Sequence, residues 1–126
     1  MITADSSTWI AYIQRNSADD TVALDRGLAL KQLVMVPVVL AELFSAPTLT
    51  EDEAELLLSV QMLPLKPGYW QRTGTLRSTV LTRGRRAALA DTLIAQCCID
   101  HAVPLITRDH DFIAFVEAAG LEAVLA

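Results

Sequence analysis

Residues 104–112 read Pro-Leu-Ile-Thr-Arg-Asp-His-Asp-Phe, and this stretch indicates how the whole chain folds. Pro104–Thr107 is short and apolar, as expected of a buried strand, and Asp109 follows it closely. A helix is predicted over Asp111–Ala119, and Gly120 would end it. A short apolar strand followed at once by a helix is typical of a parallel sheet that is covered on both faces.

The same alternation of short strands and helices runs through the rest of the chain. Four further strands are predicted, at Met1–Ala4, Leu33–Val36, Met62–Leu65 and Glu122–Leu125. Helices are predicted from the capping cluster Asp5–Thr8 into Trp9–Ile13, over Thr21–Lys31, from Pro37 to Phe44, from Thr50 through Leu58, over Tyr69–Val80 and over Ala87–Ile99. The chain shows no internal repeat and no linker. We therefore expect one α/β domain over residues 1–126, of the doubly wound kind.

Composition limits the class of protein. Of the 126 residues, 52% are hydrophobic and 20% are charged, which indicates a globular domain and excludes a disordered chain. The two cysteines, Cys97 and Cys98, are adjacent in a predicted helix and cannot pair with each other, which favours a reducing compartment. The longest apolar run, Leu33–Ala41, contains Pro37 and is shorter than the roughly 18 residues that span a bilayer. We expect a cytoplasmic protein without a membrane anchor.

The charge balance is acidic. The chain carries 15 acidic and 10 basic residues, which gives a formal net charge of -5. A protein that binds nucleic acid only by neutralising phosphates is expected to be basic, so this composition argues against a generic polyanion binder. If the ligand is a nucleic acid, something must offset the negative charge of the protein.

Four acidic residues interrupt apolar segments or end predicted strands: Asp5, Glu42, Asp91 and Asp109. A carboxylate buried alone is costly unless a cation, hydrogen-bond donors or water offset that cost. Because the carboxyl ends of parallel strands share one edge of the sheet, we expect Asp5 and Asp109 to meet there. Glu42 and Asp91 are expected in the opening turns of helices that border the same edge. Converging carboxylates repel one another, and all-oxygen ligands favour Mg²⁺ or Mn²⁺ over Zn²⁺.

Each of these acids also has an ordinary structural interpretation. Asp5 alone would serve as a helix N-cap, Asp91 as a first-turn acid favoured by the helix dipole, and Glu42 as the partner of an arginine. Most of the remaining acids, Asp20 among them, are expected on solvated faces or in the first turns of helices. A joint site is the hypothesis that accounts for all four misplaced acids at once.

Four pieces of the sequence resemble the PIN domain, and more narrowly the VapC toxins of bacterial toxin-antitoxin pairs. They are Asp5-Ser6-Ser7 after the first strand, Val39-Leu40-Ala41-Glu42-Leu43 after the second, Asp91-Thr92-Leu93-Ile94-Ala95, and residues 105–112. The resemblance covers the whole chain in order. It implies a three-layer PIN-like fold, with a short, mostly parallel, twisted sheet and helices on both faces. It also implies an endoribonuclease that depends on Mg²⁺ or Mn²⁺, usually a homodimer that a small VapB-like antitoxin holds inactive.

The resemblance assigns roles to the acids. By position, Asp5, Glu42, Asp91 and Asp109 match the acidic quartet of the family. Hydrolysis of an RNA phosphodiester bond needs an activated water and neutralisation of the charge that grows on phosphorus, and divalent metal supplies both. We expect Asp5, Asp91 and Asp109 to bind the metal, and Glu42 to be a further ligand or to orient the attacking water.

Other residues are expected to support the site or the substrate. Ser7 matches a small polar residue that often supports the quartet, Asp111 matches a second acid of more variable role, and Thr107 is expected to hydrogen-bond a carboxylate. Contacts to RNA phosphates are expected from Arg85, Arg86 and Arg108. One departure from the family is Ala102-Val103, which stands where a glycine commonly precedes the fourth strand.

Two other functions remain open from the sequence. The chain could be a metal-free acidic module that binds a basic peptide, or a PIN nuclease of RNA processing that is not a toxin. Phosphoryl transfer through an aspartyl-phosphate is disfavoured, because the only lysines, Lys31 and Lys66, are poorly placed to hold a phosphoryl group. Binding of Mn²⁺ would separate a nuclease from the metal-free module.

Overall fold

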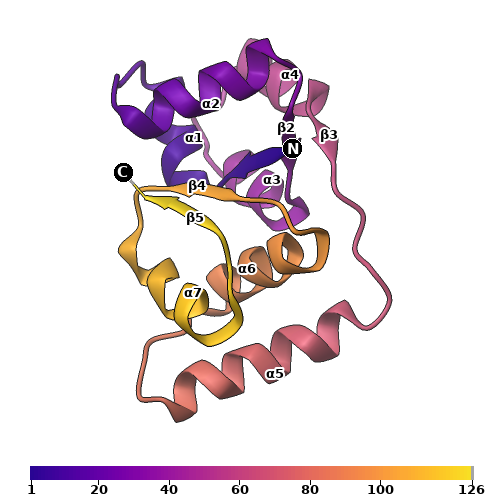
Figure 1. Cartoon of the computed structure of the whole chain (residues 1–126). Coiled ribbons are helices and arrows are strands. Elements are labelled where there is room, and N and C mark those ends of the chain that lie inside the picture. Colours follow the sequence, from indigo (N-terminus) through magenta and orange to yellow (C-terminus); the bar gives the residue numbers. More distant parts are fainter. Residues whose placement is uncertain (126) are drawn as a thin grey trace.

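The computed structural model describes residues 1–125, in which five strands form one sheet (Figure 1). The strands are β1 (Ile2–Ala4), β2 (Leu33–Met35), β3 (Gln61–Met62), β4 (Leu105–Thr107) and β5 (Ala123–Leu125). Their order across the sheet is β3-β2-β1-β4-β5, and every neighbouring pair is parallel. The predicted α/β fold with a mostly parallel sheet is therefore confirmed.

Helices cover both faces of this sheet. They are α1 (Ser6–Ile13), α2 (Asp19–Ala29), α3 (Pro37–Phe44), α4 (Glu51–Ser59), α5 (Tyr69–Thr82), α6 (Leu89–His101) and α7 (Ile113–Ala119), with a 3-10 turn, η1 (His110–Phe112), before α7. In Figure 1, α1 and α2 lie on one side of the sheet and α6 and α7 on the other, with α5 outside α6 and α7. This arrangement gives the three layers that the resemblance implied.

The central strands are buried on both faces, which explains their apolar sequences. Thr3 in β1 aligns with Val34 of β2 and Leu105 of β4, and its hydroxyl donates a hydrogen bond of 2.6 Å to the carbonyl of Val34. Large side chains fill the space between sheet and helices, with Trp9, Tyr69, Phe112, Phe115 and Leu24 fully buried. The order of β2, β1 and β4 places the ends of β1 and β4 side by side.

Strand β3 differs from the prediction, which placed it at Met62–Leu65. The observed strand is Gln61–Met62, both exposed, and the Leu63 amide donates one further bond of 2.9 Å to the carbonyl of Met35. Pro64 has no amide hydrogen and ends the ladder there. Smaller differences concern helix starts: α2 begins at Asp19 and not at Thr21, and α6 begins at Leu89 and not at Ala87.

The turn before β4 places Ala102 in an unusual conformation. Ala102 ends α6 with φ 52° and ψ 43°, in the left-handed region, and its side chain is exposed. The amides of Ala102 and Val103 donate to the carbonyls of Ile99 and Cys98, which closes the helix end. This is the position at which the sequence departs from the glycine of the family, and an alanine strains the backbone there.

We expect Ala102→Gly to stabilise the protein by about 0.5–1 kcal/mol, because glycine adopts this conformation without a steric cost. Ala29→Gly is the matched control, since Ala29 is also exposed at a helix end but lies within α2, where glycine is unfavourable. Thermal melting of both variants checks the sign. A lower melting temperature for Ala102→Gly than for the wild type would contradict the assignment of strain to this turn.

Candidate active site

The first acid of the site, Asp5, lies where β1 passes into α1. Its Oδ1 accepts hydrogen bonds from the Thr8 amide, at 3.2 Å, and from the Ser7 hydroxyl, at 2.7 Å. Its Oδ2 accepts a bond of 2.7 Å from the Thr107 hydroxyl, which comes from β4. Asp5 is thus the N-cap of α1, as one interpretation held, and it also joins the two central strands. The Ser7 and Thr107 side chains both support it.

The second acid, Asp109, follows the end of β4. Its amide donates to the Thr107 hydroxyl at 2.9 Å, and its Oδ1 accepts a bond of 2.9 Å from the Asp111 amide. Asp109 therefore caps the short turn η1, which returns the Asp111 side chain to the same side of the chain as Asp109. Asp91 approaches them from the first turn of α6.

The carboxylates of Asp91, Asp109 and Asp111 form the tightest group of acids among residues 1–125. One oxygen from each lies within 4.8 Å of the oxygens of the other two. This geometry differs from the expected ligand set, in which Asp5 accompanied Asp91 and Asp109 and Asp111 was only supporting. Asp5 is not one of these three residues: both of its oxygens accept hydrogen bonds, and its negative charge still contributes to raising the pKa of Asp91.

Glu42 lies in the second turn of α3 and not in its opening turn, so that part of the sequence prediction was wrong. The sequence places Pro37 at the start of the helix, and five residues later the chain has passed one full turn. Its Oε1 is buried and has no hydrogen-bond partner among the described residues. Burial raises the pKa of Glu42, the negative charge of Asp5 raises it further, and the nearby Ser6 hydroxyl lowers it.

The pKa of Asp91 is raised to about 6. Burial is the largest cause, followed by the charges of Asp109, Glu42, Asp5 and Asp111. The dipole at a helix N-terminus favours a negative charge, and here burial and the neighbouring carboxylates outweigh it. Burial likewise raises the pKa of Asp5, although its three hydrogen bonds lower it.

The donor set fits a hard divalent cation. Every group that converges here is a carboxylate or hydroxyl oxygen, and Mg²⁺ and Mn²⁺ prefer such ligands. The buried Oε1 of Glu42 adds a polar atom that lacks a partner within residues 1–125. Asp91, Asp109 and Asp111 are the residues whose spacing could hold the ion.

The basic residues near the site are in different situations. Arg85 forms an exposed ion pair of 2.7 Å with Glu117 of α7, Arg83 approaches the carbonyl of Glu117 at 3.5 Å, and Arg86 is exposed. All three precede α6 and therefore lie in the loop that leads to Asp91. An exposed ion pair of this kind contributes little and opens readily, so Arg85 remains available to a ligand.

Asp20 departs from the sequence prediction, and Arg108 is its partner. Asp20 was expected on a solvated face or as a capping acid, but its side chain is fully buried and binds Arg108 at two points, with distances of 2.7 and 2.8 Å. The adjacent Arg108 guanidinium lowers the pKa of Asp20. Two nitrogens of the Arg108 guanidinium are therefore engaged by Asp20, and its side chain keeps an exposed fraction of 33%. The spacing of acids along α2 does not indicate that Asp20 pairs with Arg108.

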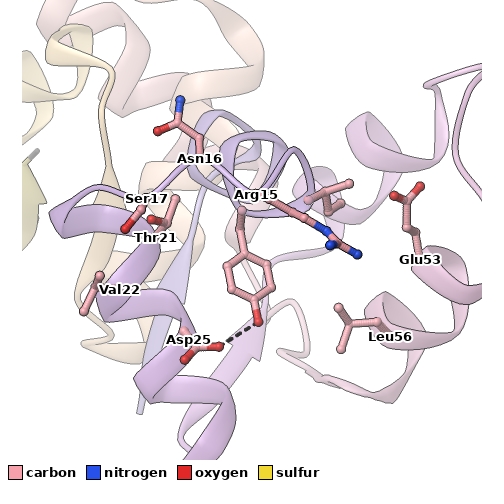
Figure 2. A pocket seen from close by; sticks show the side chains of 10 residues that line it. Arg15, Asn16, Ser17, Thr21, Val22, Asp25, Glu53 and Leu56 are labelled. Atoms are coloured by element: carbon pink, nitrogen blue, oxygen red, sulfur yellow. Dashed lines mark hydrogen bonds between the residues drawn. The ribbon is translucent and has the colours of Figure 1, made fainter.

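Two surface hollows lie along α1. The first, shown in Figure 2, is lined by residues of α1, α2 and α4, and the Tyr12 hydroxyl donates to Asp25 across it at 2.8 Å. The second is lined by Ile10, Leu43 and Leu49, among others, and by Glu42. Ile13 and Glu53 border both hollows, and Glu42 is the one predicted site acid that lines the second.

Comparison with known proteins identifies the fold family. The sequence model of the PIN domain matches residues 2–118. A search of curated protein sequences gave no match. Within residues 1–125, none of the helices combines the length and the apolar character that crossing a membrane requires.

Several solved structures share the fold over almost the full chain. A member of the VapBC family of toxin-antitoxin systems from Mycobacterium tuberculosis, VapBC-5, has 26% identity and a TM-score of 0.67, with 99% of this chain and 98% of that chain covered. VapBC2 from Rickettsia felis, bound to a promoter DNA fragment, has 18% identity and a TM-score of 0.74, with 100% and 99% covered. FitAcB from Neisseria gonorrhoeae has 23% identity and a TM-score of 0.72, with 98% and 96% covered. The family match over most of the chain, together with these folds, shows that the chain belongs to the PIN domain family.

Proposed function

We propose that the protein is a metal-dependent endoribonuclease and the toxin of a toxin-antitoxin pair. The observation that carries this proposal is the convergence of Asp91, Asp109 and Asp111 within 4.8 Å at the edge of the sheet. The family match supports a nuclease, and the VapBC neighbours support a toxin with an antitoxin partner. Mg²⁺ or Mn²⁺ is the proposed cofactor, and the cytoplasm is the proposed location.

The acids have distinct proposed roles in phosphodiester hydrolysis. Bound divalent metal supplies charge neutralisation at phosphorus and an activated water. Asp91, Asp109 and Asp111 would hold the metal, with Asp5 contributing from the side on which Ser7 and Thr107 orient it. The proposed role of Glu42 is to accept a hydrogen bond from the attacking water and so to orient it, which the unpartnered Oε1 supports.

The charge distribution agrees with an RNA substrate. Without Asp5, Glu42, Asp91 and Asp109, the chain has 11 acidic and 10 basic residues, so much of its negative charge belongs to the site. A bound divalent cation would offset that charge and allow a polyanion to approach. We propose that Arg83, Arg85 and Arg86, in the loop before α6, contact RNA phosphates at the rim.

The proposed partner is a small VapB-like antitoxin, and the proposed assembly of the toxin itself is a homodimer. A site rich in carboxylates attracts a basic side chain, and the second hollow along α1 offers an apolar surface beside Glu42. An antitoxin segment could place Arg or Lys among the acids and cover Ile10 and Ile13 with apolar side chains. Both contacts would keep RNA from the site.

The proposed mechanism predicts metal dependence. We expect cleavage of single-stranded or looped RNA in Mg²⁺ or Mn²⁺ and no cleavage in excess EDTA, because the site offers only oxygen ligands. Zn²⁺ should be a poor substitute. Gel analysis of a structured RNA after incubation with purified protein is the measurement. Equal cleavage rates with and without EDTA would exclude the proposed mechanism, and Mn²⁺ binding without cleavage of any RNA would exclude the ribonuclease.

Asp91→Asn tests whether the acids share one pocket. Carboxylates whose oxygens lie within 4.8 Å repel each other by roughly 3 kcal/mol per ionised pair at an effective dielectric of about 20. Since Asn keeps the shape and removes the charge, the variant should melt at a higher temperature than the wild type in EDTA, and it should lose cleavage. Mn²⁺ stabilises a binding protein by about 2.7 kcal/mol at a hundredfold excess over Kd, and Asp91→Asn should lose most of this gain.

The raised pKa of Asp91 predicts that the stability of the protein in EDTA depends on pH. The pKa of Asp91 is about 6 in the folded protein, above its ordinary value of 3.8, so the folded state holds the proton more tightly. The contribution of Asp91 to stability is therefore greatest below its ordinary pKa of 3.8 and is lost as pH rises through about 6. Asp91→Asn should show a weaker dependence over this range.

Asp52→Asn is the control for both measurements, because Asp52 is an exposed acid in the first turn of α4. It should lose about 0.3–1 kcal/mol in EDTA and keep the full stabilisation by Mn²⁺. If Asp91→Asn behaved as this control does, Asp91 would lie outside the metal site.

The antitoxin prediction concerns activity in the complex. Co-expression with the proposed VapB-like antitoxin should give a stable complex that does not cleave RNA. Replacing the basic residue that enters the site should restore cleavage, while apolar contacts keep the pair together. Size-exclusion chromatography and a cleavage assay measure the two effects separately. A complex that cleaves RNA as fast as the free protein would contradict the toxin assignment.

A further inference from the structure

We propose that the buried ion pair of Asp20 and Arg108 positions the metal-binding carboxylates, so that both are positioning residues of the site. The inference rests on the proposed function, because it concerns the geometry of the same metal centre. It assigns a role to two residues outside the group of converging acids. It also gives Arg108 a role other than the predicted contact with RNA.

The pair belongs to a closed ring of contacts that passes through Asp5 and Asp109. The Thr8 hydroxyl donates to Asp20 Oδ2 at 3.0 Å, and the Thr8 amide donates to Asp5 Oδ1 at 3.2 Å. Thr107 then links Asp5 to Asp109, since its hydroxyl donates to Asp5 and accepts from the Asp109 amide. The ring closes along the chain, because Arg108 is the residue between Thr107 and Asp109.

The geometry of the ion pair is that of a rigid connection. Nε of Arg108 lies 2.7 Å from Asp20 Oδ2, and Nη2 lies 2.8 Å from Asp20 Oδ1, so two parallel bonds fix the guanidinium plane. The Asp20 side chain has an exposed fraction of 0% and that of Arg108 33%. The two residues are 88 positions apart, and the pair ties α2 to the turn after β4.

This connection acts on the metal ligands through the backbone. Arg108 directly precedes Asp109, and Asp109 in turn accepts the amide hydrogen of Asp111. Holding Arg108 therefore limits the directions in which both carboxylates can point. Thr8 carries the same restraint to α1, whose N-cap is Asp5. Groups that orient metal ligands in this way commonly change metal affinity by about 10- to 100-fold when they are removed.

For Arg108, the effect of charge and the effect of positioning on Mn²⁺ binding have opposite signs, which makes the inference testable. Removing a positive charge near a cation site should strengthen binding of Mn²⁺. Loss of positioning should weaken it. A double variant, Asp20→Asn with Arg108→Met, leaves the net charge unchanged and avoids a buried unpaired carboxylate, so it reports on geometry without either complication.

The experiment measures the Kd for Mn²⁺ by titration calorimetry on the full chain, together with melting in EDTA. We expect Arg108→Met and the double variant to raise the Kd by about tenfold or more. Arg108→Lys, which keeps the charge but loses the planar fork, should raise it by less. If Arg108→Met does not fold, the double variant and Arg108→Lys decide the question.

Arg72→Met is the matched control. Arg72 also binds a carboxylate at two points, Asp100, at 3.0 and 2.6 Å. Asp100 is nine residues from Asp91 along α6, which corresponds to about 13 Å at 1.5 Å per residue. This variant should lower the melting temperature and leave the Kd for Mn²⁺ within about twofold of the wild type, since neither Arg72 nor Asp100 is adjacent to a proposed metal ligand.

Three outcomes would overturn the inference. The Kd of Arg108→Met could equal or fall below that of the wild type, which is the result of charge removal alone. The KM for RNA could rise with no change in the Kd for Mn²⁺, which would make Arg108 a substrate contact. A wild type that binds no Mn²⁺ would overturn the proposed function together with the inference. The first two outcomes would overturn the inference only.

Discussion

The hydrogen bond between Thr107 and Asp5, 2.7 Å long, is the contact on which the arrangement of the site depends. It joins the ends of the two central strands, whose parallel pairing already places them side by side. Because Asp5 also caps α1, the same carboxylate sets the start of a helix and the spacing of the sheet edge. A change at Asp5 is therefore a change in both fold and site, and the two effects must be measured separately.

The acids at this edge work against folding when no cation is present. Burial and mutual repulsion raise the pKa of Asp91, Asp5 and Glu42, so the folded protein would gain stability by taking up protons. A divalent cation offsets the same repulsion without protonation, and it leaves the carboxylates charged. Binding of such a cation would therefore couple the folding free energy to occupancy of the site.

Two ion pairs of similar geometry have different consequences in this structure. Arg72 and Asp100 connect α5 to the C-terminal end of α6. Arg108 and Asp20 connect α2 to the residue before Asp109. The first pair fixes the outer helix to the layer that α6 forms, whereas the second is one residue from an acid of the site. The effect of each ion pair on the site therefore depends on which helix or turn it holds in place.

Much of the fold and part of the site follow from local sequence, since hydrophobic spacing, Pro37 and Gly120 predict the elements and most of their ends. The acids Asp5, Glu42, Asp91 and Asp109 stand out for the same reason, because a carboxylate in an apolar segment is a local anomaly. Tertiary structure alone decided that Asp111 lies with Asp91 and Asp109, and that Asp5 is turned toward Ser7 and Thr107. It also decided that Asp20 is buried against Arg108. Helix and strand periods act over a few residues, but the partner of Asp20 lies 88 positions away and was selected by how α2 packs on the sheet.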